Sequence, residues 1–474
     1  MTAGKTADVR EGAPAGGLVS RLVGAFAGSD AAAGDARAQR TVVIGTIGSV
    51  SLNAVTLVIN FLLAVVLART LGTAGYGAYA VALAWAMFLA VPASLGVGPL
   101  VVRHVAAYAQ REEWGLLRGV IRRTNEAVLA AALAIVAVAV VVGLALRDSR
   151  PEIIGPFLIG LLLVPLISLT LLRHAAIQGL HRVILARLPD TIVLPGVLLA
   201  LALAAAAVLG DRFTASWAIS LNVLAAGVAF AVGAALLRWA LPEQVRRATA
   251  EYEHRDWVRS ALPLLVMSLF LTLNSQVGTI LLGALDGADA AGMFNVAMRA
   301  AMFTSFLFLA ATYPLYPNVA RLWTVGDSAA IQRLLTRAIR IVSLFSVVAA
   351  LVFLVFADQI LGIFGQEFTG ASIALRILVA GEFVKVMMGF GGVALVMTSQ
   401  ERSMARAAGL GVGLNVALAL ALIPVWGVNG AATASAASAI ASSAYIAWLS
   451  WRRLGLYAPA VGRSTPRGGT SSSG

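Results

Sequence analysis

Twelve long apolar runs dominate the chain and restrict it to a fold that crosses a membrane repeatedly. The runs lie near Val42–Ala68, Tyr76–Val97, Ala127–Leu146, Ile153–Leu172, Thr191–Leu209, Thr214–Leu237, Leu262–Leu285, Ala291–Leu315, Ile341–Ala357, Ile373–Val396, Ala407–Pro424 and Ala431–Trp451. Each approaches the roughly 20 residues that an α-helix needs to cross a bilayer. Backbone polar groups find no water in hydrocarbon, so repeated crossing favours helices, and continuously apolar runs disfavour a β-barrel. The runs therefore predict an all-α integral membrane protein with about twelve helices.

Composition excludes several other classes of protein. Of the 474 residues, 60% are hydrophobic and 12% are charged, whereas soluble domains contain about twice that share of charge. The chain has no cysteine, which removes disulfide frameworks, thiolate metal sites and cysteine nucleophiles. The four histidines all fall in expected cytoplasmic segments, so we expect no intramembrane histidine relay, no metal site and no enzymatic activity.

The distribution of cations predicts the orientation. With the amino terminus in the cytoplasm, 28 of the 35 Lys and Arg residues lie on that side and four lie opposite, at Arg69, Arg147, Arg150 and Arg212. Such an excess marks the cytoplasmic side. We therefore expect both termini in the cytoplasm and a multi-pass location in the plasma membrane. The net charge of +13 then reflects topology, and no nucleic-acid partner is expected.

Two basic segments are expected to contact the membrane surface. Arg103–Arg123 and Arg321–Arg340 combine apolar residues with arginines at helical spacing. This pattern is typical of helices that lie on the inner membrane surface against anionic lipids.

A weak internal repeat divides the chain into two lobes. At an offset of 215 residues, the first half recurs in the second through the pairs Gly72–Gly287, Gly77–Gly292, Val81–Val296, Ala82–Ala297, Ala86–Ala301, Met87–Met302, Phe88–Phe303, Arg118–Arg333 and Arg122–Arg337. Six helices per copy make the lobes parallel repeats around a central cavity. We expect a flexible cytoplasmic tail (1–40), two six-helix lobes (41–238 and 261–452), a cytoplasmic linker (239–260) and a second flexible tail (453–474).

Several motifs resemble the polysaccharide (O-antigen type) flippases of the multidrug/oligosaccharidyl-lipid/polysaccharide exporter superfamily. Ala68–Ala80 is similar to the first interhelical signature of that family, and Leu281–Gly283 is similar to its counterpart in the second half. Ile360–Phe368 and Gly427–Ala432 resemble later turns. The resemblance implies a fold like that of the multidrug (MATE) exporters and alternating-access movement of a lipid-linked oligosaccharide. Gly278 departs from the family pattern, because many relatives are expected to carry an acidic residue there.

Four charged residues lie within the expected spans, all in the second half: Arg299, Arg376, Glu382 and Lys385. A charge near the bilayer centre costs about 3 kcal/mol on insertion scales, so these side chains should face protein or a wet cavity. Arg299 and Lys385 are candidates to bind the pyrophosphate of the cargo, because phosphate oxygens suit Arg and Lys donors. Arg376, nearer the outer surface, can extend outward. The alternative for Glu382 and Lys385, three residues apart, is mutual neutralisation.

Uncharged polar residues complete the candidate cavity. Those on the first, seventh and eighth expected spans are Asn53, Asn60, Asn274, Ser275, Gln276 and Asn295. Amides and hydroxyls can bind sugar hydroxyls, or they can hydrogen-bond neighbouring helices instead.

Other functions remain open. They are a multidrug exporter coupled to cations, a flippase for peptidoglycan precursors or teichoic-acid-type lipids, and an integral-membrane glycan polymerase or ligase. We expect no bound cofactor. An H⁺ or Na⁺ gradient is the candidate energy source, with Glu382 as the candidate coupling site. Glycan-assembly proteins that act on the same cargo are candidate partners.

Overall fold

The computed structural model describes residues 36–146, 148, 150–252, 254–398 and 400–456, and the side chains of 36–54 and 254–264 fall outside the description. Within these ranges every regular element is a helix. The predicted tails lie largely outside the described residues, and the first described helix begins at Ala36 rather than near Val42.

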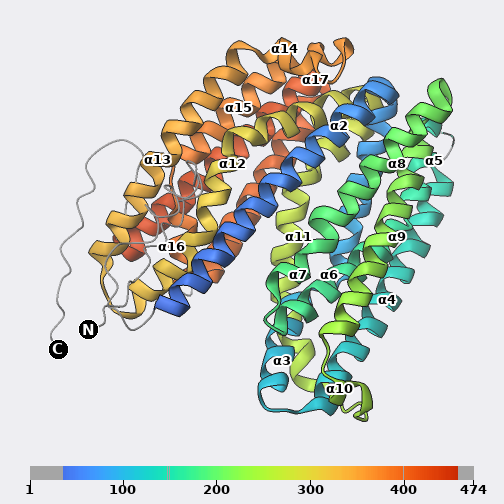
Figure 1. The fold of residues 1–474 in the computed structure, drawn as a ribbon. Coiled ribbons are helices and arrows are strands. Elements are labelled where there is room, and N and C mark those ends of the chain that lie inside the picture. Colours follow the sequence, from blue (N-terminus) through green and yellow to red (C-terminus); the bar gives the residue numbers. More distant parts are fainter. Residues whose placement is uncertain (1–35, 147, 149, 253, 399, 457–474) are drawn as a thin grey trace, which may run out of the picture.

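The first half forms most of one bundle of helices, and the first part of its long helix α2 (Ala36–Ala93) runs along the other bundle beside α12 (Ala288–Thr324) (Figure 1). Its elements are α2 (Ala36–Ala93), α3 (Gly98–Gln110), α4 (Trp114–Ala145), α5 (Pro151–Gly160), α6 (Leu163–Gly179), α7 (Val183–Leu188), the π-helix η1 (Pro189–Val193), α8 (Leu194–Leu209), the short η2 (Gly210–Arg212), α9 (Ala215–Ala240) and α10 (Glu243–Arg247).

The second half forms most of the other bundle, and its first helix α11 (His254–Leu285) passes beside α3 of the first bundle (Figure 1). Its elements are α11 (His254–Leu285), α12 (Ala288–Thr324), α13 (Ser328–Val355), α14 (Ala357–Gly362), η3 (Gln366–Ala371), α15 (Ser372–Met387), α16 (Gly391–Met397) and α17 (Glu401–Leu454).

All twelve predicted runs fall on these helical segments. Two pairs of runs are merged, because α2 and α17 each continue through a kink at a glycine, Gly72 and Gly427. Among the described residues, nine helices are long and apolar enough to cross a membrane, and the predicted tenth span is divided between α15 and α16. The all-α membrane fold is therefore confirmed.

The expected surface helices were only partly right. α3 is a separate short helix, but α4 begins at Trp114 and runs without a break into its apolar part. Likewise α13 begins at Ser328, where the Asp327 carboxylate caps the helix by accepting from the Ala330 amide at 2.8 Å. The arginines of 321–340 thus lie on the last turn of α12 and the first half of α13, on long helices that continue into apolar parts.

Of the three apolar cores in the described part of the chain, one is shared between the two lobes. One large core contains side chains of both lobes, from α2, α5 and α9 and also from α12, α15 and α17. Two smaller cores are confined to a single lobe each, one around α3, α4 and α6 and one around α12, α13 and α16. The bundles consequently diverge toward the end that carries α3 and α10, which we call the basic end (Figure 1).

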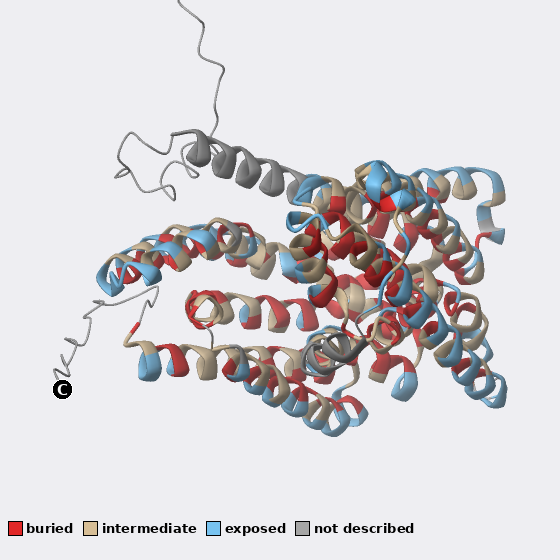
Figure 2. Cartoon of the chain, turned by 90° about the horizontal axis from the view of Figure 1, so that it is seen from below, coloured by how far each residue is buried: buried red, intermediate tan, exposed pale blue. Residues whose placement is uncertain are grey.

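Large apolar side chains also cover the outside of the molecule. Val138, Val141, Val208, Leu344 and Val355 are each more than 60% exposed on α4, α8 and α13. Seen from the basic end, buried residues lie where helices face one another, and exposed residues lie on outward faces (Figure 2). Water would penalise such a surface, whereas lipid would not.

The two lobes meet most closely at a pair of equivalent glycines at the joined end. A Cβ on Gly77 would lie 1.7 Å from the Ala288 carbonyl oxygen, and one on Gly292 would lie 2.3 Å from the Thr73 carbonyl oxygen. The preceding pair, Gly72 and Gly287, both have positive φ, at 66° and 114°. Both copies of the repeat therefore carry glycine at the turn, Gly72 and Gly287, and at the close contact between the lobes, Gly77 and Gly292.

Polar contacts reinforce this closed end. The Thr73 hydroxyl donates to the Asp289 carboxylate at 2.6 Å, which joins the two lobes. The Arg69 guanidinium donates to the Ile363 carbonyl at 2.7 Å. These bonds and the shared core hold one end shut while the basic end stays open.

The segment between the lobes is docked on α4. Arg118 donates to the carbonyl oxygens of Arg246 and Ala248 at 2.8 and 2.7 Å, and the Glu251 amide donates to the Gly115 carbonyl at 3.1 Å. A Cβ on Gly119 would lie 1.7 Å from the Glu251 carbonyl oxygen, so the contact needs glycine. The first part of the predicted linker is thus attached to the first lobe.

We predict that Gly77→Ala and Gly292→Ala each open the closed end, because the added methyl cannot fit against the facing backbone. The melting temperature of the purified protein should fall by several degrees for each variant. Gly227→Ala in α9 is the matched control, because no atom lies within 4 Å of its Cβ and alanine favours helix by up to about 1 kcal/mol. Equal stability of all three variants would contradict the tight contact.

Candidate functional site

Two adjoining cavities occupy the region between the lobes. The first, of about 390 Å³, is walled by α2, α6, α8 and α9. The second, of about 290 Å³, lies between α2 and α12. Asn60 and Arg299 line both, so these two side chains stand where the cavities meet. We call the two together the central cavity.

A third cavity extends the space toward the basic end. It has about 580 Å³ and is lined by the α2–α3 turn, by α6 and by Ser268 and Thr272 of α11. Leu171 lines both this cavity and the central one, which makes them neighbours. Ser94, Ser168 and Gln178 add polar groups to its wall. A path of cavities therefore leads from the basic end to Arg299.

Arg299 is held by a network of polar side chains at the closed side of the cavity. Its Nε donates to the Asn295 side-chain oxygen at 2.9 Å, and the Tyr76 hydroxyl donates to the same oxygen at 3.2 Å. The Asn295 amide nitrogen faces the Thr279 hydroxyl at 3.4 Å. Tyr76 belongs to the first lobe and the others to the second, so the network crosses between the lobes.

A second pair of side chains continues the polar wall inside the first lobe. The buried Asn222 amide donates to the Tyr79 hydroxyl at 2.8 Å, and both residues line the central cavity. The rings of Tyr76 and Tyr79 lie 6.2 Å apart. Each of these buried polar groups has a partner, as buried polar groups require.

The charge of Arg299 is not neutralised. Within the described part of the chain, Arg299 makes no ion pair, and its partner Asn295 is neutral. The residue lies about 16 Å along α12 from Ala288, at 1.5 Å per residue, which is near mid-membrane. An unpaired guanidinium in a cavity of low dielectric constant attracts an anion with several acceptor oxygens.

Lys385 and Glu382 lie elsewhere and are paired with each other. The Lys385 ammonium contacts the Glu382 carboxylate within α15, and the side chains are 30% and 14% exposed. Neither residue lines the central cavity or the one toward the basic end. The structure thus shows the neutralised pair that the sequence left open as the alternative.

The other candidates serve contacts between helices. Arg376 pairs with Asp358 at 3.0 Å near the surface. The Asn415 amide donates to the Asn274 side-chain oxygen at 3.1 Å, and Gln276 contacts the Met87 sulfur at 3.5 Å. The side chain of Asn53 lies outside the described residues. Of the sequence candidates, the structure brings together Asn60, Asn295 and Arg299.

Ser275 and Gly278 have equally local surroundings. The Ser275 hydroxyl donates to the Thr272 carbonyl within its own helix at 2.8 Å. A Cβ on Gly278 would lie 2.5 Å from the ring of Phe294, so the aromatic side chain fills the space that an acidic residue would take. The ring of Phe294 therefore gives a steric reason for glycine at position 278, where the family pattern is expected to have an acidic residue.

Sequence reasoning missed a carboxylate in the cavity. Asp190 lines the central cavity from the π-helix η1, and its Oδ2 lies 3.7 Å from Nδ1 of His174 on α6. His174 in turn lines the cavity toward the basic end. The expected spans Ile153–Leu172 and Thr191–Leu209 stopped short of both residues, whereas the long apolar helical segments of the structure, Pro151–Gly179 and Val183–Leu209, include them. The span was expected to begin at Thr191, whereas the helix runs on from Val183 through a π-turn.

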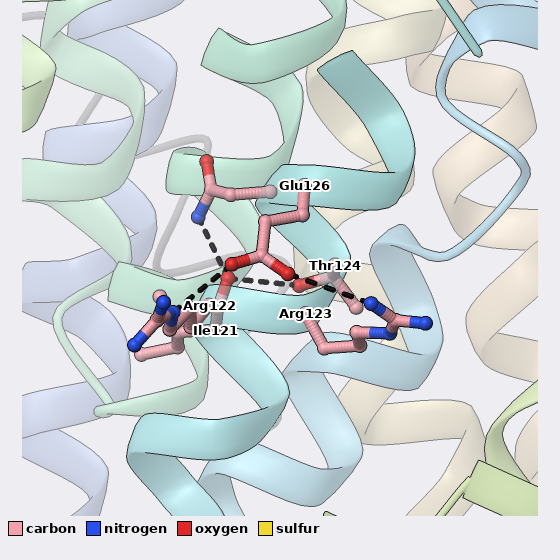
Figure 3. A network of polar contacts seen from close by, with 6 residues as sticks. Ile121, Arg122, Arg123, Thr124 and Glu126 are labelled. Atoms are coloured by element: carbon pink, nitrogen blue, oxygen red, sulfur yellow. Dashed lines mark hydrogen bonds and ion pairs between the residues drawn. The ribbon is translucent and has the colours of Figure 1, made fainter. Parts of the chain in front are cut away.

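A further charged cluster at the basic end is separate from the cavity. Figure 3 shows Glu126 of α4 between two arginines, with the Arg122 Nε at 2.9 Å and an Arg123 nitrogen at 3.5 Å. These side chains are about half exposed, and exposed pairs of this kind contribute little to stability. The cluster is a solvated surface at the end of a helix.

Comparisons with known proteins agree with this architecture. The family profile described as "Polysaccharide biosynthesis protein" matches residues 42–323. The "Probable low-salt glycan biosynthesis flippase Agl15" of Haloferax volcanii is 28% identical over 145 residues, which cover 30% of this chain and 31% of that protein.

Solved membrane transporters share the fold. The inward-facing conformation of a multidrug resistance MATE family transporter of the MOP superfamily is 14% identical, with a TM-score of 0.66 over 86% of this chain and 98% of that one. The lipid II flippase MurJ in an inward closed conformation is 14% identical, with a TM-score of 0.63 over 86% and 87%. The expected MATE-like fold is confirmed, and the chain is a multi-pass membrane protein.

We predict that Glu382 and Lys385 stabilise the fold as a unit. Glu382→Gln and Lys385→Gln should each lower the melting temperature, because each leaves a largely buried charge without its partner. The double variant, which carries no charge, should recover most of the loss. Additive losses in the double variant, measured by thermal unfolding in detergent, would contradict the pairing.

Proposed function

Because the chain belongs to the polysaccharide biosynthesis protein family, we propose that it is a flippase that carries a phosphate-bearing, lipid-linked glycan across the plasma membrane. The observation that supports this most directly is the unpaired Arg299 in the central cavity. Asp190 in the same cavity is accompanied by His174, whereas Arg299 has no anion beside it among the described residues. The cavity therefore favours an anionic cargo.

The cavity sizes and linings suit the two ends of such a cargo differently. A pyrophosphate would bind Arg299, and the hydroxyl and amide groups toward the basic end would hydrogen-bond sugar hydroxyls. Volumes of about 390 and 580 Å³ are within the usual range for small-molecule sites. The polyprenyl tail would remain in the lipid outside the bundles.

Transport would proceed by alternating opening of the two ends. The cargo would enter from the basic end, which the positive-inside rule places in the cytoplasm. Release on the other side requires the shared core and the Gly77–Gly292 contact to separate while the basic end closes. Rocking of one lobe against the other is the general form of such transitions.

The family and the MATE-like fold also admit a cation-coupled exporter, and Asp190 in the cavity is the feature that favours it. A cationic cargo would need this carboxylate and would be repelled by Arg299. The two functions therefore predict opposite effects of the same substitution.

We predict that Arg299→Gln weakens the binding of geranylgeranyl pyrophosphate to the purified protein by about tenfold to a hundredfold. A hydrogen bond to a charged group contributes about 1.5–3 kcal/mol, which corresponds to this range. Lys385→Gln should change binding less than twofold, since Lys385 lies outside the cavity. Calorimetric titration in detergent measures both.

If Arg299→Gln and Lys385→Gln weakened pyrophosphate binding equally, the phosphate site would lie near Lys385 and not in the central cavity. If Arg299→Gln instead left pyrophosphate binding intact and tightened the binding of ethidium, a cationic exporter would replace the flippase.

We predict that both ends of the chain face the cytoplasm. The chain contains no cysteine, so single introduced cysteines report accessibility without background. In intact cells, a membrane-impermeant maleimide should label Gly210→Cys, at the end opposite the basic one, and spare Val325→Cys. The reverse labelling pattern would invert the topology.

A further inference from the structure

Asp190 and His174 form a titratable pair on the wall of the cavities. The carboxylate and the imidazole nitrogen lie 3.7 Å apart, on η1 and α6. Both side chains are partly buried, with 36% and 23% of their surface exposed. Asp190 lines the central cavity and His174 the adjoining one, so water can reach the pair from the basic end.

The local backbone is unusual at this pair. Asp190 lies in a π-turn that begins at Pro189, which has no amide hydrogen to donate. The Thr191 carbonyl accepts from the Thr56 hydroxyl of α2 at 3.0 Å. π-turns inside α-helices occur often at functional sites, where they turn a side chain toward a cavity.

The charges around the pair are almost all positive. Arg173 precedes His174 on α6 and stacks on the Phe230 ring at 3.6 Å. Arg187 precedes Asp190 by three residues on α7, and Arg299 lies on the shared cavity wall from α12. The described side chains of α2 add the titratable Tyr79 at the cavity and a cation only at Arg69, at the closed end. α8 carries no charged residue, and α9 carries only Arg238 near its end.

This arrangement suits a proton better than a metal cation. A metal ion such as Na⁺ prefers several oxygen ligands, whereas the group paired with Asp190 is an imidazole and the nearby stretches of α6 and α7 carry arginines. An imidazole beside a carboxylate, in contrast, changes its charge near neutral pH.

We propose that Asp190 and His174 bind a proton and thereby tune the affinity of the central cavity for its anionic cargo, an inference that rests on the proposed flippase function. When the pair takes up a proton, the cavity gains one positive charge. Because Arg299 lies in the same cavity, an anion bound there is then held more tightly.

The size of the effect follows from electrostatics. A unit charge about 10 Å away, at an effective dielectric constant of about 20, changes an affinity by roughly tenfold. Glu382, the carboxylate first considered for ion coupling, is paired with Lys385 and lines neither cavity, so it cannot act on Arg299 in this way.

The experiment measures binding of geranylgeranyl pyrophosphate to the full-length protein between pH 5.5 and 8.5. In the unaltered protein, affinity should rise by roughly tenfold toward low pH beyond the change caused by the ligand's own titration. Asp190→Asn should bind tightly over the whole range and retain only the ligand's own dependence. His174→Gln should reduce the pH response, and serves as the second variant if Asp190→Asn folds poorly.

The double variant Glu382→Gln/Lys385→Gln is the matched control, because it removes the other buried acid and keeps the net charge unchanged. Its pH response should equal that of the unaltered protein. An unchanged response in Asp190→Asn, or its loss in the double variant, would overturn the proposal.

A measurement without cargo separates this inference from the proposed function. The protein has four histidines, so ring signals in histidine-labelled protein can be assigned by substitution. Asp190→Asn should lower the pH at which His174 titrates, because the neighbouring negative charge is lost. If that shift occurs but no pyrophosphate binds, the result contradicts the proposed flippase function and still supports the pairing of Asp190 with His174. If no shift occurs, the pair itself is refuted.

Discussion

The whole architecture depends on the two lobes sharing an apolar core at one end and lacking one at the other. The closed end has the Gly77–Gly292 contact, where backbone meets backbone and no side chain can intervene. Toward the basic end the two smaller cores each lie within one lobe, and among the described residues the lobes touch there only where α11 passes the α2–α3 turn, with Leu265 against Gly96. An interface like that of the closed end favours two states, fully packed or fully open. Protein interiors are densely packed, and a narrow gap that excludes water loses van der Waals contacts on both of its walls. The cavities and their path to the basic end follow from this uneven packing.

The electrostatics of the cavity depend on the same division. Arg299 enters the space from the second lobe, while Asp190 and His174 lie on the wall of the first. A charge is tolerated near mid-membrane only when protein or water surrounds it, and the gap between the lobes provides both. The network through Asn295 and Tyr76 then fixes the guanidinium without neutralising it. Opposite lobes therefore carry the groups that a cargo and a proton would use.

Much of the fold could be predicted from the sequence, and rather less of the site. Continuous apolar runs are read directly, and the repeated glycines at Gly72 and Gly287 mark turns whose positive φ only glycine adopts readily. The orientation of the charged side chains could not be predicted in this way. The spacing of Glu382 and Lys385 within one helix indicated that they could pair, but it did not decide between pairing and a place in the cavity. Whether Arg299 faces the cavity depends on how helices far apart in sequence pack. Asp190 was missed because the expected span began one residue later, at Thr191, although the helix already runs through Pro189 and Asp190 as a π-turn.

The docking of the interlobe segment on α4 has a mechanical consequence. Arg118 donates hydrogen bonds to two carbonyl oxygens of that segment, and the Glu251 backbone packs on Gly119. This stretch of chain is therefore fixed to the first lobe. In the proposed rocking movement, the free covalent link between the lobes would be only the short stretch between Glu251 and the start of α11, and its length would limit how far they separate.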